Sequence, residues 1–178
     1  ENKVKIQTFA SAKQKEYIPL KLYVSKQGGR NYLMCKGMED NRFYSIRTDY
    51  IKSVSQSLKA NDFSIVKIRF EDILRHIWGV SYSAGKLEHF EMDVYVGKGE
   101  EYIVSRLERE KRCGKVTKLD EETYRFSVDL YDSYELVPWI RTFFGRIKRL
   151  KCSNRMVSDQ IKFDIVKMSK QYGEENGF

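Results

Sequence analysis

Histidine and cysteine are scarce in this sequence of 178 residues, which contains 2 His and 3 Cys. The cysteines are odd in number, widely spaced and form no CxxC pair, which argues against a disulfide framework or a zinc site and fits a reducing cytosol. His76 and His89 belong to no HxxxH or HxxE pattern and have no neighbouring cysteine, so metal ligation is not expected. We therefore expect no metal, no cofactor and a cytoplasmic location.

Catalytic and phosphate-binding motifs are also missing. The sequence has no GxSxG, no GxxxxGKS/T and no GxGxxG, so neither a nucleophile elbow nor a nucleotide-binding glycine loop is indicated. The acidic run 120–122 falls where a turn is expected and is typical of solvated charge. We expect a protein that is not an enzyme.

No apolar run approaches the roughly 18 residues that span a bilayer, so no membrane association is expected. The chain does not begin with Met and opens directly into strand-like sequence. Its first residues do not resemble a signal peptide. We expect it to be a fragment of a longer protein whose N-terminal part is missing.

Positive charge is concentrated at one end of the chain. The net charge is +8, and residues 1–56 hold 11 Lys and Arg against 5 Asp and Glu. Such a surface attracts polyanions and strengthens phosphate contacts. Because tyrosines are interleaved with these charges, nucleic acid is a better explanation than solubility alone.

Apolar residues in the first third recur with period two, which predicts strands. Turn residues separate them at 27–29 and 39–41. Short strands with tight turns in about 55 residues favour a small barrel, since closure removes the edges of a small sheet. The strands expected are Val4–Phe9, Ile18–Ser25, Asn31–Gly37 and Phe43–Ile51.

Residues 55–69 are polar and predict an irregular connector, while Phe70–Trp78 has the spacing of a short amphipathic helix. Small and turn residues at 79–85 indicate a domain boundary. The remainder predicts β-α-β-β-α-β, the ferredoxin-like order, with one extra C-terminal helix. The expected class is α+β, with a barrel at 1–56, a connector with a short helix at 57–85 and a ferredoxin-like module at 86–178. Within that module the expected elements are the strand Leu87–Val96, the helix Glu100–Arg112, the hairpin of Lys115–Leu119 and Thr123–Tyr131, a short helix capped by Ser133, the strand Arg146–Cys152 and a final helix, capped by Ser153 or Asn154, that ends near Tyr172.

Basic and aromatic side chains in the first third suggest a ligand site. Lys21 and Tyr23 share one strand face because alternate side chains of a strand point the same way. Arginine bonds phosphate oxygens in pairs and tyrosine stacks on bases, a mixture found on single-strand binders. We expect Tyr44 to lie near Arg47. The candidate site residues are Lys21, Tyr23, Arg30, Tyr32, Arg42, Tyr44, Arg47 and Tyr50.

Three segments, 17–23, 29–33 and 45–51, together resemble the WYL domain. In that family a segment with a proline leads to a Trp-Tyr-Leu strand and then to a strand patterned aromatic-Arg-Leu-Asp-Arg-Ile. Residues 136–140 and 144–145 look like the extension that usually follows it. By this resemblance Tyr32 takes the central tyrosine, Arg47 the first arginine and Asp49 the aspartate. The sequence departs from the pattern at Asn31 for tryptophan, Ile46 for the aromatic residue and Tyr50 for the second arginine.

The resemblance implies the effector-sensing and dimerisation portion of a bacterial transcriptional regulator. Its Sm-like or SH3-like barrel would bind single-stranded DNA or RNA, and a missing N-terminal helix-turn-helix would bind promoter DNA. It also implies a homodimer. Two alternatives stay open: a sensor for one nucleotide or cyclic dinucleotide, and a purely structural dimerisation module.

Overall fold

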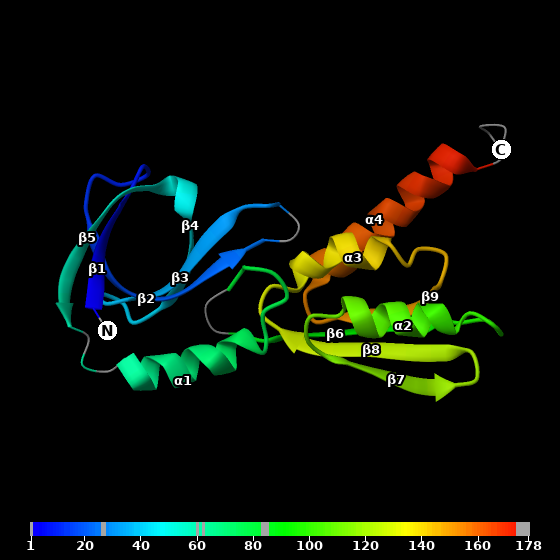
Figure 1. Ribbon diagram of the computed structural model, residues 1–178. Coiled ribbons are helices and arrows are strands. Elements are labelled where there is room, and N and C mark those ends of the chain that lie inside the picture. The colour runs from blue at the N-terminus through cyan, green and yellow to red at the C-terminus, as the bar shows by residue number, and fades with distance from the viewer. Residues whose placement is uncertain (1, 26–27, 60, 62, 83–85, 174–178) are drawn as a thin grey trace. The chain divides into compact units, whose positions relative to one another are not determined.

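The computed structural model describes residues 2–25, 28–59, 61, 63–82 and 86–173. The chain divides into two compact units, Glu1–Gly85 and Lys86–Phe178. The described residues form an α+β protein with two antiparallel sheets and four α-helices (Figure 1). None of these helices is both long and apolar enough to cross a membrane.

The first unit is built on a five-stranded sheet with the strand order β4-β3-β2-β1-β5. Neighbouring strands lie about 4.8 Å apart, so the outer strands of a flat sheet of this size would be about 19 Å apart. Here β4 and β5 are joined by the three residues of a 3-10 helix, so that the link from Arg47 to Ile51 reaches at most about 14 Å. The sheet must therefore curl, as its trace does in Figure 1. The elements are β1 (Asn2–Thr8), β2 (Lys15–Val24), β3 (Asn31–Gly37), β4 (Phe43–Arg47), η1 (Thr48–Tyr50), β5 (Ile51–Lys59) and α1 (Phe63–Leu74).

Both faces of strands β3 and β4 are covered. On one face Cys35 is buried with Ile6 and Tyr17. On the other face Phe43 is buried against α1, where its ring stacks on Phe70 with 6.0 Å between centroids. The alternation of side chains along the strands thus serves two apolar layers, one inside the curl and one under the helix.

Three expectations for this unit were wrong. Residues 55–59 are strand rather than connector, and the helix spans Phe63–Leu74 rather than Phe70–Trp78. Two serines of β5 hydrogen-bond to other strands of the sheet: Ser53 donates to Gln7 of β1 at 3.4 Å, and Ser57 donates to Glu16 of β2. Polar residues therefore replace the apolar alternation that marks a strand. The expected strand Phe43–Ile51 is likewise interrupted by η1.

The second unit carries a four-stranded sheet with the order β7-β8-β6-β9 and all neighbours antiparallel. Its core lies between one face of the sheet and the helices. There Phe126 of the sheet and Trp139 of the helical layer pack edge to face, with 5.0 Å between the ring centroids. Figure 1 shows α2 and α3 on the same side of this sheet. The elements follow as β6 (Glu88–Tyr95), α2 (Glu101–Glu110), β7 (Lys115–Asp120), β8 (Thr123–Leu130), η2 (Ser133–Leu136), α3 (Val137–Arg141), β9 (Ile147–Cys152) and α4 (Arg155–Tyr172).

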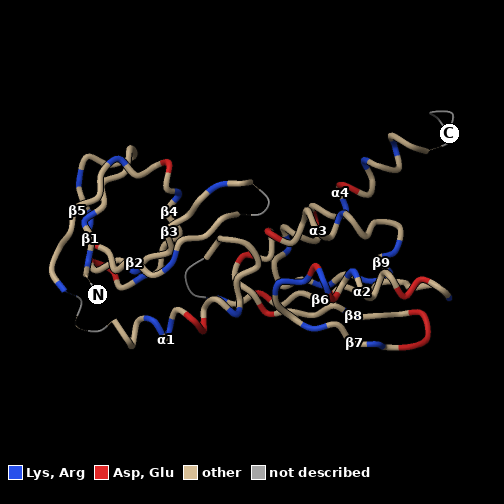
Figure 2. Tube along the Cα trace, in the orientation of Figure 1, with Lys and Arg blue, Asp and Glu red and all other residues tan. Residues whose placement is uncertain are grey.

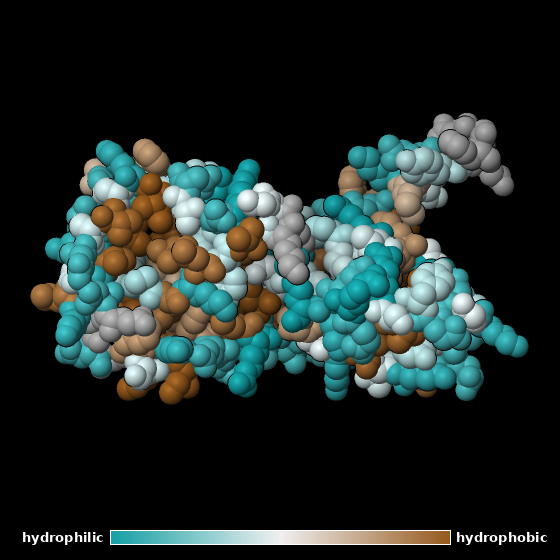
Figure 3. Space-filling view, in the orientation of Figure 1, coloured by the Kyte–Doolittle hydropathy of each residue, from teal (hydrophilic) through white to brown (hydrophobic). Residues whose placement is uncertain are grey.

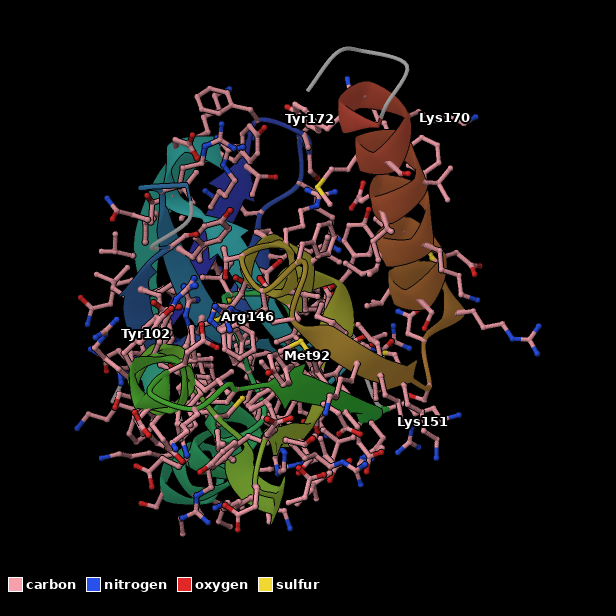
Figure 4. All side chains as sticks on the ribbon, turned by 90° about the vertical axis from the view of Figure 1, so that its right-hand side faces the viewer. Met92, Tyr102, Arg146, Lys151, Lys170 and Tyr172 are labelled. Atoms are coloured by element: carbon pink, nitrogen blue, oxygen red, sulfur yellow. The ribbon has the colours of Figure 1, made fainter. Side chains whose placement is uncertain are left out.

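Helix ends in the second unit have specific partners. Asn154 caps α4 by accepting a hydrogen bond from the Met156 amide at 3.0 Å, and α4 ends at Tyr172, as the sequence predicts. Glu100 precedes α2 and accepts hydrogen bonds from Arg146 at 2.6 and 2.7 Å. Arg146 also reaches Tyr102 of α2, and Figure 4 shows both side chains. The short segment before β9 is thereby tied to α2.

Charge differs between the two units. In Figure 2 Lys and Arg predominate along the first unit, whereas both signs are frequent along the second. The first unit also exposes large apolar side chains, and Figure 3 shows hydrophobic residues at its surface. Those more than half exposed in this unit are Phe9, Leu22, Val24, Tyr50, Val54, Leu58, Ile65 and Ile68.

Candidate ligand site on the first unit

Three of the candidate residues lie side by side in one row across the sheet. Tyr23 of β2 is opposite Tyr32 of β3, which is opposite Arg47 of β4. Directly opposed residues of antiparallel strands point to the same face. Tyr23 and Tyr32 are half-buried, and the Arg47 side chain is 20% exposed. The row therefore presents two phenol rings and a guanidinium on one surface.

Arg47 is held by the two residues that follow it in η1. Its Nε donates to Asp49 Oδ1 at 3.0 Å and its Nη2 to Asp49 Oδ2, while Nη1 donates to the Tyr50 hydroxyl at 3.1 Å. The Tyr50 ring centroid lies 4.2 Å from the Arg47 Cζ, a cation–π contact. This arrangement follows from the chain, because Arg47 ends β4 and the tight turn folds Asp49 and Tyr50 back onto it.

The Arg47–Asp49 pair is electrostatically coupled. The hydrogen bonds from Arg47 lower the pKa of the Asp49 carboxyl, and the same contact raises the pKa of Arg47. A guanidinium has five N–H donors, and three of those on Arg47 are used by Asp49 and Tyr50. The other two have no partner among the described residues, so Arg47 is fixed in place and retains donors for an anion.

Lys21 extends the site along β2. Its ammonium lies 5.3 Å from the centroid of the Tyr23 ring, and it forms no hydrogen bond or ion pair with any described residue. Burial raises the pKa of the Tyr23 hydroxyl. The structure thus brings together Lys21, Tyr23, Tyr32, Arg47 and Tyr50.

Tyr44 does not belong to this row. It lies three residues before Arg47 on the same strand, so the two side chains point to opposite faces. The Tyr44 hydroxyl donates to Asp40, which raises the pKa of Tyr44 to about 12. The Tyr44 and Tyr17 rings meet edge to face, with 5.7 Å between their centroids. The expectation that Tyr44 lies near Arg47 was therefore wrong.

The remaining two candidates lie in turns. Arg42 is exposed, and its amide donates to Asp40 at 3.2 Å, beside the Tyr44 cluster. Arg30 is exposed at the end of the β2–β3 turn, and its charge contributes to lowering the pKa of Asp49. Arg30 therefore lies near the row of Tyr23, Tyr32 and Arg47, whereas Arg42 lies near Tyr44.

Sequence reasoning missed two features of this face. The hydroxyl of Ser45, in the row next to Tyr32 and Arg47, is buried without a hydrogen-bond partner among the described residues. A pocket also lies between α1 and β2. The pocket could not be inferred from the sequence because its helix was expected further along the chain. A lone serine in a strand gives no sequence signal of burial.

Other reactive groups lie apart from the row. Within the described part of the chain no three His, Cys, Asp or Glu residues converge as metal ligands do. Burial raises the pKa of Cys35 to about 12 and that of Cys113 to about 11. Thiols with such values are not thiolates near neutral pH, so they are weak nucleophiles.

Comparisons with known proteins give few relatives. No protein-family model matches the chain, and no curated protein does. Among solved structures the chain is similar to "Proteasome accessory factor B/C (PafBC) of Arthrobacter aurescens", with 12% sequence identity and a TM-score of 0.42. The match covers 97% of this chain and 25% of that one, so the chain spans about a quarter of the length of that protein.

Proposed function

We propose that this chain is the effector-sensing and dimerisation portion of a bacterial transcriptional regulator of the WYL type, and that it binds single-stranded nucleic acid. The observation that carries the proposal is the row of Tyr23, Tyr32 and Arg47, with Arg47 already fixed by Asp49 and Tyr50. Tyr32, Arg47 and Asp49 occupy the positions at which the sequence resembles the WYL pattern.

The chemistry of the row suits a single strand. Tyrosine rings provide platforms for bases, and stacking tolerates any base. Arg47, Lys21 and Arg30 supply cations on the same side for the phosphates between those bases. A guanidinium that is held before the ligand arrives loses little rotamer freedom on binding, which favours affinity.

The finer fold assignment belongs to the same proposal. The curl of the first sheet supports an Sm-like or SH3-like barrel. The element order of the second unit, with its strand order β7-β8-β6-β9, supports a ferredoxin-like module. A cytoplasmic location, a homodimer and a promoter-binding domain preceding this chain complete the proposed regulator. The proposed role is binding rather than catalysis.

A sensor for one nucleotide or cyclic dinucleotide is the second candidate, favoured by the two unused donors of Arg47. The salt dependence of the binding affinity distinguishes the single-strand binder from the nucleotide sensor. About three phosphate contacts on a single strand predict roughly a tenfold or greater loss of affinity between about 50 and 200 mM salt. A mononucleotide should show a much shallower dependence. Fluorescence anisotropy with labelled single-stranded DNA and RNA, and with nucleotides as competitors, measures both.

Arg47→Ala tests the site. Loss of the guanidinium should weaken binding of single-stranded DNA about tenfold to a hundredfold, as loss of a charge-assisted phosphate contact does. Tyr32→Phe isolates the contribution of that hydroxyl. The matched control is Lys167→Ala, an exposed cation on α4, which should leave affinity unchanged. A folded Arg47→Ala protein that binds DNA and nucleotides as tightly as the parent would place the site elsewhere.

A further inference from the structure

A pocket of about 230 Å³ lies between α1 and β2 in the first unit. Its apolar walls come from Phe63, Phe70 and Leu74 of the helix and from Leu20 of the strand. Drug-sized ligands occupy about 300–1,000 Å³. The volume therefore suits a smaller molecule with one or two rings.

Three charged side chains line the same pocket: Lys21, Lys67 and Glu71. Lys67 and Glu71 are four residues apart on one helix, a spacing at which opposite charges often pair. They form no ion pair here, and Lys21 forms none either among the described residues. The apolar pocket thus carries two cations and one anion that form no ion pair with any side chain the structure describes.

We propose that this pocket binds a small aromatic carboxylate, with its ring against Phe63 and Leu74 and its carboxylate at Lys21 and Lys67. The apolar walls favour a planar hydrophobic body, and the polar rim fixes its orientation. The charges at the rim sum to one positive charge, which a monoanion balances. A phosphomonoester, with a charge near −2, would exceed this single positive charge and leave the occupied pocket with a net negative charge.

This site is distinct from the row of Tyr23, Tyr32 and Arg47. Lys67, Glu71 and Phe63 belong to α1, whereas the described partners of Arg47 are Asp49 and Tyr50 of η1. Lys21 alone has a place in both, since its ammonium also lies over the Tyr23 ring. The pocket can therefore be tested whether or not the row binds nucleic acid.

The test uses 1-naphthaleneacetate as the probe, with its neutral amide and 2-(1-naphthyl)ethylamine as matched analogues. Binding to the whole chain is followed by two-dimensional NMR. The acid should bind with shifts at residues of α1 and β2. Lys67→Gln should weaken the acid about threefold to tenfold and leave the amide unchanged, because an exposed charge contact is modest. Glu71→Gln should tighten the acid, and Phe63→Ala should weaken acid and amide alike.

Two controls make the outcome decisive. Lys52→Gln removes an exposed cation on β5 and should change nothing. Arg47→Ala should leave binding of the probe intact, which separates this pocket from the proposed nucleic-acid site. Equal affinity for acid, amide and amine, stronger binding of the amine, or a Lys67→Gln protein that binds the acid like the parent would overturn the proposal.

Discussion

A guanidinium without fixed neighbours samples many rotamers, but Arg47 is held on three sides. Asp49 takes one edge of its fork, Tyr50 takes a further N–H, and the Tyr50 ring covers one of its faces. The carboxylate reduces the net charge offered to an anion while it fixes the geometry. Under the proposed function, the fixed geometry and the reduced net charge of Arg47 favour recognition of a ligand with a defined shape over indiscriminate attraction of any polyanion.

At the residue scale His89 provides a pH-dependent contact in the second unit. Its Nδ1 lies 2.7 Å from Asp129, and its Nε2 lies 3.4 Å from Glu91. The hydrogen bond to Asp129, followed by that to Glu91, raises the pKa of His89 above its ordinary value of 6.5. The protonated ring is therefore stabilised by folding.

Because the pKa of His89 is raised in the folded state, its contribution to stability decreases as pH rises. The contribution of His89 is fully present below about pH 6.5, its unfolded pKa, and is lost as pH rises through the higher folded pKa. Asp129→Asn should lower the pKa of His89 and reduce the loss of stability over that window. An NMR titration of the His89 ring, assigned with a His89→Gln variant, and urea unfolding at several pH values measure both. An unchanged pKa of His89 in Asp129→Asn would contradict the assigned cause.

At the element scale α1 covers one face of β3 and β4 through Phe70, which is 3% exposed and stacks on Phe43. Phe70→Ala should destabilise the first unit by about 3–5 kcal/mol, the usual result of removing a buried phenyl ring. Ile65 on the same helix is 70% exposed, and Ile65→Ala should change stability by less than about 0.5 kcal/mol. Urea unfolding compares the two. Equal effects would mean that α1 is not packed as described.

The same helix shows where sequence reasoning stops. Strands β2 and β3 could be predicted because their apolar positions alternate, and Tyr23, Tyr32 and Arg47 could be grouped on that basis. The helix could not be placed, because Ile65 and Ile68 are apolar but exposed and blur its period. Strand β5 could not be recognised because its apolar residues, Ile51, Val54 and Leu58, are three and four positions apart instead of alternating, and Val54 and Leu58 are exposed.

The remaining errors in the candidate site concern the face of the sheet to which a side chain points and the element that packs on that face. Tyr44 was grouped with Arg47 by closeness in sequence, although a separation of three residues reverses the face of a strand. The pocket beside Lys21 requires α1 and β2 to meet, and no local pattern encodes that contact. Sequence spacing could therefore predict which residues share the row of Tyr23, Tyr32 and Arg47. It could not predict that α1 packs over the same sheet.

At the scale of the whole molecule each unit has its own buried core, and α4 carries apolar side chains that its own unit leaves exposed. Figure 4 shows Lys170 and Tyr172 near the end of this helix, far from the buried Met92. Phe163 and Val166 are more than half exposed. Exposed apolar surface of this kind often marks an interface.

Under the proposed function we expect a homodimer, because regulators that read two-fold operators are commonly two-fold symmetric. Sedimentation velocity at micromolar to high micromolar concentration should show a species of twice the chain mass of 21.1 kDa. A single species at the monomer mass over that whole range would contradict the expectation for this chain.

The turn Thr48–Tyr50 both joins the outer strands of the first sheet and supplies the two side chains that hold Arg47. The held conformation of the Arg47 side chain therefore exists only while the first sheet is folded. Under the proposed function, a ligand that needs this shape binds the folded unit alone and at about one hundred times its dissociation constant adds roughly 2.7 kcal/mol to its stability. Unfolded chains are continuously removed by proteases. The concentration of the effector would then set not only the occupancy of the regulator but also its lifetime in the cell.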